Sequence, residues 1–197
     1  MTEFRKSFEE ENAIFLPILE KIDTYRGKKR LIIAIDGGSA SGKTTLSKSL
    51  EKIYDATVLH MDDFFLTPDM RTEKRLSEVG GNVSWERFEG EVLLPLTQEK
   101  EISYRAFDCK TEKFKEATVI APQKIVIIEG AYSMHMALAG YYDFSVFLNI
   151  NKNEQKKRIL NRNPSLASRF FDSWIPMEDN YFEKTNIKNR CDLVINI

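Results

Sequence analysis

A glycine-rich segment between residues 37 and 45 contains the residues whose types and spacing indicate chemistry most directly. Gly37 to Thr44 fits the pattern G-x-x-x-x-G-K-[ST] without a mismatch. Backbone N–H groups of such a loop can surround a polyphosphate, and the positive end of the following helix dipole points at it. Lys43 supplies a charge for the outer phosphates, and the Thr44 hydroxyl can ligate Mg²⁺. The sequence therefore predicts a nucleoside triphosphate site made by Gly37, Gly38, Ser39, Ala40, Ser41, Gly42, Lys43, Thr44 and Thr45.

Acidic side chains follow two other apolar segments. Asp62 and Asp63 come after residues 57–61, and Glu129 ends the apolar run 125–128. Ligands of a parallel α/β sheet bind beyond the carboxyl ends of its strands, so these acids should lie beside the phosphate loop. Glu129 suits a metal ligand, and Asp62 suits a catalytic base that can also reach the metal shell through water. The alternatives are a turn with solvated acids for Asp62 and Asp63, and a helix-capping acid for Glu129.

Basic residues are concentrated after the apolar segment 144–150. Arg158 and Arg162 share one helical face, and Arg169 follows them. With Lys156 and Lys157 they form a cluster on the side of the sheet where a lid could close over phosphates. The alternative is a solvated helix face with a Glu154–Arg158 ion pair.

These residues need a scaffold in which strands and helices alternate. The hydrophobic pattern predicts strands at 31–36, 57–61, 125–129, 144–150 and 192–197. Helices are expected from Lys43, over 84–96 with Ser84 as its cap, from about 153, and over 165–185. Segments 101–108 and 116–121 are expected to form a short antiparallel pair. The predicted fold class is therefore α/β, a mainly parallel sheet with helices on both faces.

The N-terminal segment predicts an amphipathic helix over residues 2–25. Its apolar residues fall on one face at helical spacing: Phe4, Phe8, Phe15, Leu19 and Ile22. Such a helix is expected to pack on the domain or on a neighbouring subunit, which leaves a homo-oligomer open. A membrane-surface role is disfavoured because the polar face mixes acids and bases. We expect residues 1–29 as helix and linker and 30–197 as one domain, with an insertion at about 100–122 and a lid-like region at about 158–185.

Composition gives no indication of a nucleic-acid or membrane partner. The 197 residues carry 29 Lys and Arg against 30 Asp and Glu, a net charge of −1. Nothing global therefore favours nucleic acid or membrane as a partner. The two cysteines, Cys109 and Cys191, form no C-x-x-C motif and are expected to be reduced thiols. A cytoplasmic location is the expectation.

With these motifs in view, the chain resembles the uridine kinase, phosphoribulokinase and pantothenate kinase group of phosphate-loop kinases, and most nearly bacterial uridine-kinase-like proteins. The resemblance lies in the loop ending at Thr45, in the segment from His60 to Phe65, and in Glu129-Gly130. It implies a P-loop NTPase fold, ATP and Mg²⁺ as cofactors, Asp62 as catalytic base and Glu129 as metal ligand. Arg158 and Arg162 fall where members of the group have lid arginines.

The acceptor region departs from the nucleoside-specific pattern of that group. Val83-Ser84 stands where those members carry an acid for the ribose hydroxyls, and their base-reading histidine has no obvious counterpart. An acceptor pocket could still form from Phe65, Trp85, Tyr104, Arg105 and Asp108, although hairpin and core packing explains the same residues.

We therefore expect an ATP-dependent kinase of a small-molecule hydroxyl, most simply on a uridine-like or cytidine-like nucleoside. The predicted catalytic residues of this kinase are Asp62 and Lys43, and the predicted metal ligands are Thr44, Glu129 and Asp62. Kinases of pantothenate or a sugar are the alternatives, as is a non-catalytic nucleotide-dependent switch. Asn151 to Glu154 is one residue type away from the guanine-reading N-K-x-D motif, but the sequence has no D-x-x-G. We interpret this tetrapeptide as a helix start.

Overall fold

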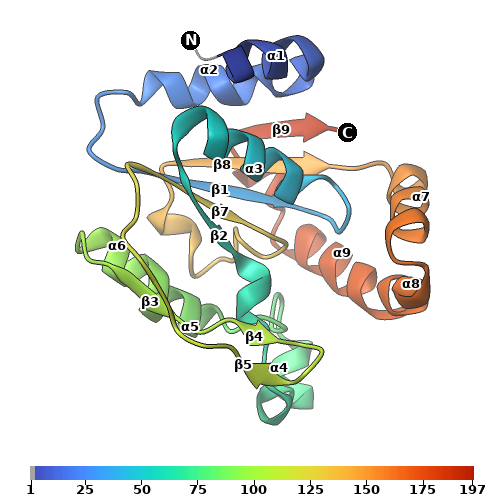
Figure 1. Ribbon diagram of the computed structural model, residues 1–197. Coiled ribbons are helices and arrows are strands. Elements are labelled where there is room, and N and C mark those ends of the chain that lie inside the picture. The colour runs from blue at the N-terminus through green and yellow to red at the C-terminus, as the bar shows by residue number, and fades with distance from the viewer. Residues whose placement is uncertain (1–2) are drawn as a thin grey trace.

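The core of the molecule is a five-stranded parallel sheet with the strand order β2-β7-β1-β8-β9. The computed structural model describes residues 3–197. All seven residues of β1 are buried, as expected for a central strand covered on both faces. The α/β prediction is confirmed, and Figure 1 shows the sheet between two helical layers. The strands are β1 (Leu31–Gly37), β2 (Thr57–His60), β7 (Ile125–Glu129), β8 (Phe144–Asn149) and β9 (Leu193–Asn196).

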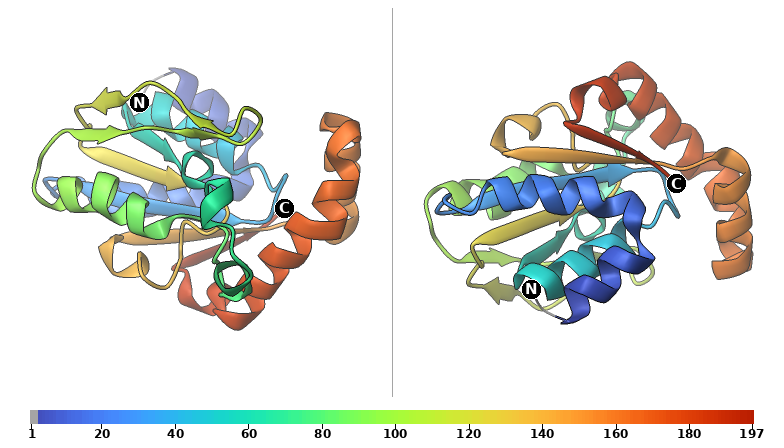
Figure 2. Two further views of the ribbon diagram at one scale, coloured as in Figure 1. Left: turned by 90° about the horizontal axis from the view of Figure 1, so that it is seen from below. Right: turned by 90° about the horizontal axis from the view of Figure 1, so that it is seen from above.

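Alternate residues of β1 contribute to two separate hydrophobic cores. Ile33 and Ile35 pack in the core that includes Leu46 and Leu50, whereas Ile32 and Ala34 pack in the other. The two layers are seen from opposite sides in Figure 2. The first layer consists of α1 (Glu3–Glu11), α2 (Leu16–Thr24) and α3 (Lys43–Tyr54). The second contains α5 (Trp85–Phe88), α6 (Leu94–Thr97), α9 (Ile175–Lys184) and α10 (Ile187–Arg190).

The prediction of a single N-terminal helix is wrong. The chain leaves helical geometry at Asn12, passes through the 3₁₀ turn η1 (Ala13–Phe15) and restarts as α2. Pro17 lies in the first turn of α2, where its missing N–H is tolerated, so it favours a new helix start rather than a continuous helix. The pair packs on its own domain, because the Tyr54 hydroxyl donates to the Leu19 carbonyl at 3.2 Å. Phe4 is 43% exposed, and residue 2 lies outside the described residues.

Helical and hairpin elements connect the strands largely as expected. The predicted helix over 84–96 is confirmed as a continuous helical stretch of α5, η4 (Glu89–Leu93, a π-helical segment) and α6. Ser84 holds the N-cap position but its side chain makes no capping hydrogen bond, which corrects that detail. The antiparallel pair is confirmed as β3 (Ile102–Tyr104) with β6 (Thr118–Ile120). A second small pair, β4 (Phe107–Asp108) with β5 (Lys113–Phe114), lies between them.

The turns after β2 and the lid-like region complete the chain. After β2 come η2 (Met61–Phe64), η3 (Pro68–Met70) and α4 (Glu73–Ser77). A short turn, η5 (Ala139–Tyr141), precedes β8. The lid-like region contains α7 (Lys152–Arg162), η6 (Pro164–Leu166), α8 (Ala167–Arg169) and η7 (Phe170–Trp174), which runs into α9. Ile159, Ala167 and Phe170 form a small core of their own there.

The cysteines and the lengths of the helices complete the description of the fold. Cys109 and Cys191 are both free thiols. Within residues 3–197, no helix has the length and apolar character needed to cross a bilayer.

Candidate active site

The phosphate loop joins β1 to α3 and has the backbone of an anion-binding turn. Gly37, Ala40 and Gly42 have positive φ values of 148°, 62° and 98°. Glycine is required at the first position, because a Cβ there would lie 2.5 Å from the Leu148 carbonyl oxygen. The loop leads directly into the first turn of α3, where the positive end of the helix dipole favours an anion.

Two polar groups of this loop fit a bound polyphosphate. The buried Lys43 Nζ donates to the carbonyl oxygens of Gly37 and Gly38, at 2.8 and 3.0 Å. The buried Ser41 hydroxyl has no hydrogen-bond partner among residues 3–197. An ammonium folded back on its own loop and an unpaired hydroxyl in the same loop suit a site whose remaining partners come from a ligand.

Glu129 ends the strand that lies directly between the other two functional strands. β7 pairs with β1 on one side, as expected for a strand beside the phosphate loop, and with β2 on the other. The Thr44 hydroxyl donates to Glu129 Oε1 at 3.1 Å, and His60 Nδ1 lies 2.6 Å from the same oxygen. Burial acts to raise the pKa of Glu129, but His60 and Lys43 outweigh it, so the pKa is lowered and the carboxylate stays ionised.

Asp62 and Asp63 follow β2 in the turn η2, and the structure separates their roles. Asp63 accepts a hydrogen bond from the Tyr104 hydroxyl at 2.9 Å. Asp62 instead lines the cavity in front of the phosphate loop. Its side chain is open to that cavity, while the protein packed around it raises its pKa against the opposing effect of Lys43. A raised pKa brings a carboxylate closer to the range in which it works as a base at neutral pH.

One cavity of about 1300 Å³ brings the predicted donor-side groups together. Its wall includes Lys43, Thr44, Asp62 and Glu129. The three predicted lid arginines also line it: Arg158, Arg162 and Arg169. The Arg158 guanidinium reaches the phosphate loop, donating to the Ala40 carbonyl at 3.3 Å, and also pairs with Glu154 at 2.8 Å. The residues predicted to bind a triphosphate and a metal, and the predicted base, therefore line one cavity.

Most of the predicted acceptor residues do not line this cavity in the described chain. Phe65 lines the cavity, whereas the other four candidates are absent from its wall as described over residues 3–197. Trp85 stacks on His135 with ring centroids 5.4 Å apart, and Arg105 lies 4.9 Å from the Phe114 ring. Asp108 accepts from the Lys110 amide at 2.8 Å, and Tyr104 is held by Asp63.

Several residues at this site carry no signal in the sequence. The buried Glu178 of α9 accepts from the Ser39 amide at 2.8 Å and from the Ser39 hydroxyl at 2.5 Å. Gln155 Nε2 donates to the Ser39 carbonyl at 2.9 Å. Asn82 and Tyr132 line the cavity near Asp62. All four lie at least 40 positions from Ser39 along the chain, so only the folded structure brings them to the site.

Fold and site together define a phosphate-loop nucleotide-binding protein with the groups of a kinase. Residues 32–169 match the Phosphoribulokinase / Uridine kinase family, and the chain belongs to this family. Its relatives include a nicotinamide riboside kinase 1 of Homo sapiens, 32% identical over 157 residues, which are 75% of this chain and 73% of that protein. A uridine kinase of Chlamydia pneumoniae is 23% identical over 185 residues, or 84% and 81% of the two chains.

The solved structures support the fold assignment. A chain described as a possible uridine kinase from Bacillus stearothermophilus superposes with a TM-score of 0.70 at 21% identity. The match covers 94% of this chain and 99% of that one. The P-loop NTPase fold implied by the resemblance is therefore confirmed.

Proposed function

We propose that this protein transfers the γ-phosphoryl group of ATP to a hydroxyl of a small molecule, with a nucleoside as the leading acceptor. The observation that carries this proposal is the meeting of Lys43, Asp62 and the Thr44–Glu129 pair on one cavity wall. A binding module or switch needs Lys43 to hold the phosphates. It does not need a carboxylate such as Asp62 to act as a base in the same cavity.

In the proposed reaction, Asp62 orients the acceptor hydroxyl and accepts its proton. The hydroxyl oxygen forms a bond to the γ-phosphorus, while the bond from that phosphorus to the β–γ bridging oxygen breaks and ADP leaves. Lys43 and the arginines on the lid side stabilise the negative charge on the phosphoryl group during transfer. Their positions around the cavity support this assignment.

The residues beside the phosphate loop fit Mg²⁺. A hydroxyl and an ionised carboxylate meet at Thr44 and Glu129, and oxygen ligands of this kind are what Mg²⁺ prefers. No group of three or more His, Cys, Asp or Glu side chains forms a complete metal cage in the described chain. Mg²⁺ in phosphoryl-transfer sites is generally held by one or two protein oxygens together with substrate phosphates and water. When bound, Mg²⁺ supplies charge neutralisation on the transferring phosphates.

A nucleoside acceptor is supported by the names of the relatives, which include uridine kinases and a nicotinamide riboside kinase. The absence of an acid at Val83-Ser84 keeps pantothenate and sugars as alternative acceptors.

The test is ADP release from Mg·ATP by the wild-type protein in the presence of uridine, cytidine, nicotinamide riboside, pantothenate and D-fructose. Acceptor-dependent ADP release is expected with at least one riboside. Tight ATP binding without release stimulated by any acceptor would contradict the kinase assignment. A preference for GTP over ATP would instead favour the switch.

A further inference from the structure

The lid-like region is attached to the domain at both ends by buried polar side chains. Gln155 of α7 is 3% exposed and Glu178 of α9 is 5% exposed. Residues 156–177, here called the lid segment, lie between them and carry the three lid arginines. Figure 1 shows α7 and α8 at the side of the molecule, away from the sheet. The lid segment has a small core of its own, which packs against Ala40 of the phosphate loop.

Both buried side chains bind the same residue of the phosphate loop. Gln155 Nε2 donates to the Ser39 carbonyl at 2.9 Å. Glu178 accepts from the Ser39 amide at 2.8 Å and from the Ser39 hydroxyl at 2.5 Å. The glycine at position 38 permits these contacts, because a Cβ there would lie 2.9 Å from Gln155 Nε2 and displace it. The amide, the carbonyl and the hydroxyl of Ser39 are therefore all engaged by the two ends of the lid segment.

One peptide group connects the phosphate-binding lysine to this contact. The Gly38 carbonyl accepts from Lys43 Nζ at 3.0 Å. The N–H of the same peptide group belongs to Ser39 and is the donor to Glu178. A bound triphosphate draws the Lys43 ammonium toward its outer phosphates, which removes a hydrogen bond from this peptide group. Ser39 is thus placed to pass a change in the phosphate loop to both ends of the lid segment.

The hydrogen bonds of Glu178 hold this contact, rather than its charge. Burial raises the pKa of Glu178, although both Ser39 donors and Lys43 act to lower it. Loss of hydration therefore disfavours the carboxylate charge at this position. A glutamine has the same shape, and its amide can accept from the Ser39 N–H and donate to the Ser39 hydroxyl oxygen. Glu178→Gln is therefore a conservative replacement that keeps the attachment.

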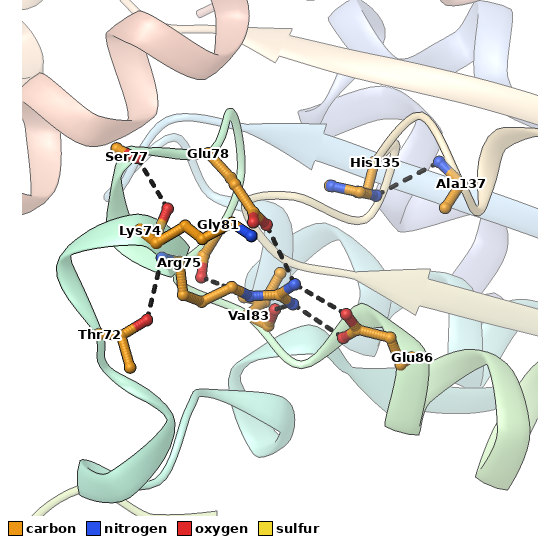
Figure 3. Close-up of polar contacts among 10 residues, drawn as sticks. All are labelled: Thr72, Lys74, Arg75, Ser77, Glu78, Gly81, Val83, Glu86, His135 and Ala137. Carbon is orange, nitrogen blue, oxygen red and sulfur yellow. Dashed lines mark hydrogen bonds and ion pairs between the residues drawn. The ribbon is translucent and has the colours of Figure 1, made fainter.

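The part of the cavity wall near Asp62 is held by contacts of its own. Arg75 donates to both carboxylate oxygens of Glu86, at 2.7 and 2.8 Å, and to two backbone carbonyls of the loop before α5 (Figure 3). The Ser84 amide, at the end of this loop, donates to the Phe64 carbonyl at 2.7 Å, in the turn that carries Asp62. None of these contacts involves the lid segment, so a loosened lid segment leaves the proposed base in place.

We propose that Gln155 and Glu178 are positioning residues that fix both ends of the lid segment on Ser39, and thereby place the lid arginines over the transferring phosphoryl group. Neither side chain touches the reacting atoms, because both act through Ser39 and the arginines. The inference rests on the proposed kinase function, in which those arginines stabilise the phosphoryl group. A displacement of about 1 Å from the reactive geometry can lower a rate by about a hundredfold.

The first test compares kcat and the Kd for Mg·ADP in Glu178→Ala, Glu178→Gln and the wild type. Glu178→Ala should lower kcat by about tenfold or more, because the lid arginines lose their fixed position. The Kd for Mg·ADP should change by less than about threefold, because the arginines act on the γ-phosphoryl group, which ADP lacks. Glu178→Gln should recover most of the lost kcat.

Asp179→Ala is the matched control. Its carboxylate lies on the same helix, but it pairs with Lys152 at 2.5 Å and not with the phosphate loop. Its kcat should stay within about twofold of the wild type. Gln155→Ala removes the other attachment and should lower kcat by about threefold or more, which keeps the comparison possible if Glu178→Ala does not fold.

A second test follows the lid segment without turnover. The two tryptophans of the chain are Trp85 and Trp174, and Trp174 lies in the lid segment on the cavity wall. In a Trp85→Phe background, saturating Mg·ADP should therefore change the fluorescence of the single remaining tryptophan. Adding Glu178→Ala should remove about half or more of that change, because the phosphate loop is then coupled to the lid segment at one end only.

Three results would overturn the positioning role. The first is a kcat in Glu178→Ala equal to that of the wild type, and the second is an unchanged fluorescence response. The third is a loss of kcat and of Mg·ADP affinity by the same factor, with a lower melting temperature, which would show a structural role of Glu178 only. Each of these leaves the kinase assignment standing. No acceptor-dependent ADP release from the wild type would instead reject the kinase function and, with it, the role of the lid arginines.

Discussion

The Asp36→Asn variant tests what one buried carboxylate contributes to stability. This carboxylate accepts hydrogen bonds from the phosphate loop and from two neighbouring segments. Asp36 is fully buried at the end of β1. It accepts hydrogen bonds from the Gly37 amide at 2.6 Å, the Met134 amide at 2.9 Å and the Tyr181 hydroxyl at 3.0 Å. Burial nevertheless raises its pKa from 3.8 to about 6, because three donors do not fully replace lost hydration.

The sign of the pH dependence follows from this raised pKa. The folded state holds the Asp36 proton more tightly than the unfolded state, so the carboxyl group's contribution to stability falls as pH rises from 3.8 to about 6. At 1.36 kcal/mol per pKa unit the full loss is about 3 kcal/mol. About 2 kcal/mol of that loss falls between pH 4.5 and pH 7.5. Asparagine does not titrate, so the variant lacks this component.

The assay is urea unfolding of the wild type and Asp36→Asn at pH 4.5 and pH 7.5. The free energy of unfolding of the wild type should fall relative to the variant by about 2 kcal/mol across that range. A difference that stays constant with pH would refute the raised pKa. A change of opposite sign would show that the three donors stabilise the anion more strongly than burial disfavours it.

Two other substitutions test separate parts of the account. Glu129→Gln should raise the Mg²⁺ concentration needed for half-maximal turnover by about tenfold or more. The measurement is a Mg²⁺ titration of ADP release. An unchanged Mg²⁺ requirement would show that Glu129 does not belong to the metal site. Leu50→Ala, at a fully buried position of α3, should lower the free energy of unfolding by about 2–5 kcal/mol. The matched control Leu160→Ala, at a residue 43% exposed, should change it by less than about 0.5 kcal/mol, and equal losses would contradict the core described here.

The donor side of the site could be predicted from sequence because its information is local. The phosphate loop is a contiguous pattern, and β1 and β7 are apolar runs that end in Gly37 and Glu129. Parallel strands place their carboxyl ends at one edge, so the meeting of Thr44 with Glu129 follows from the topology. The break at Asn12 was missed because helical spacing continues across it in the sequence, even though Pro17 favours a new start.

The acceptor side could not be predicted in the same way. Trp85 and Tyr104 have the size and polarity of pocket residues, but His135 and Asp63 engage them instead. Tyr132 reaches the cavity through a positive φ that its sequence does not indicate. Glu178 reaches the phosphate loop only because α9 packs beside it, 139 positions after Ser39 in the chain. Such contacts depend on loop conformation and helix packing, which residue type and spacing do not determine.

The most direct test of the phosphoryl-transfer site is a comparison of Asp62→Asn with the wild type in two measurements on the same preparation. Mg·ATP affinity, measured by calorimetry, should change little because Asp62 does not belong to the phosphate loop. Acceptor-dependent ADP release, measured with the most active acceptor of the panel, should fall by about a hundredfold or more when the base is lost. Turnover within about twofold of the wild type would contradict the assignment of Asp62 as the base and, with it, the proposed chemistry of this cavity.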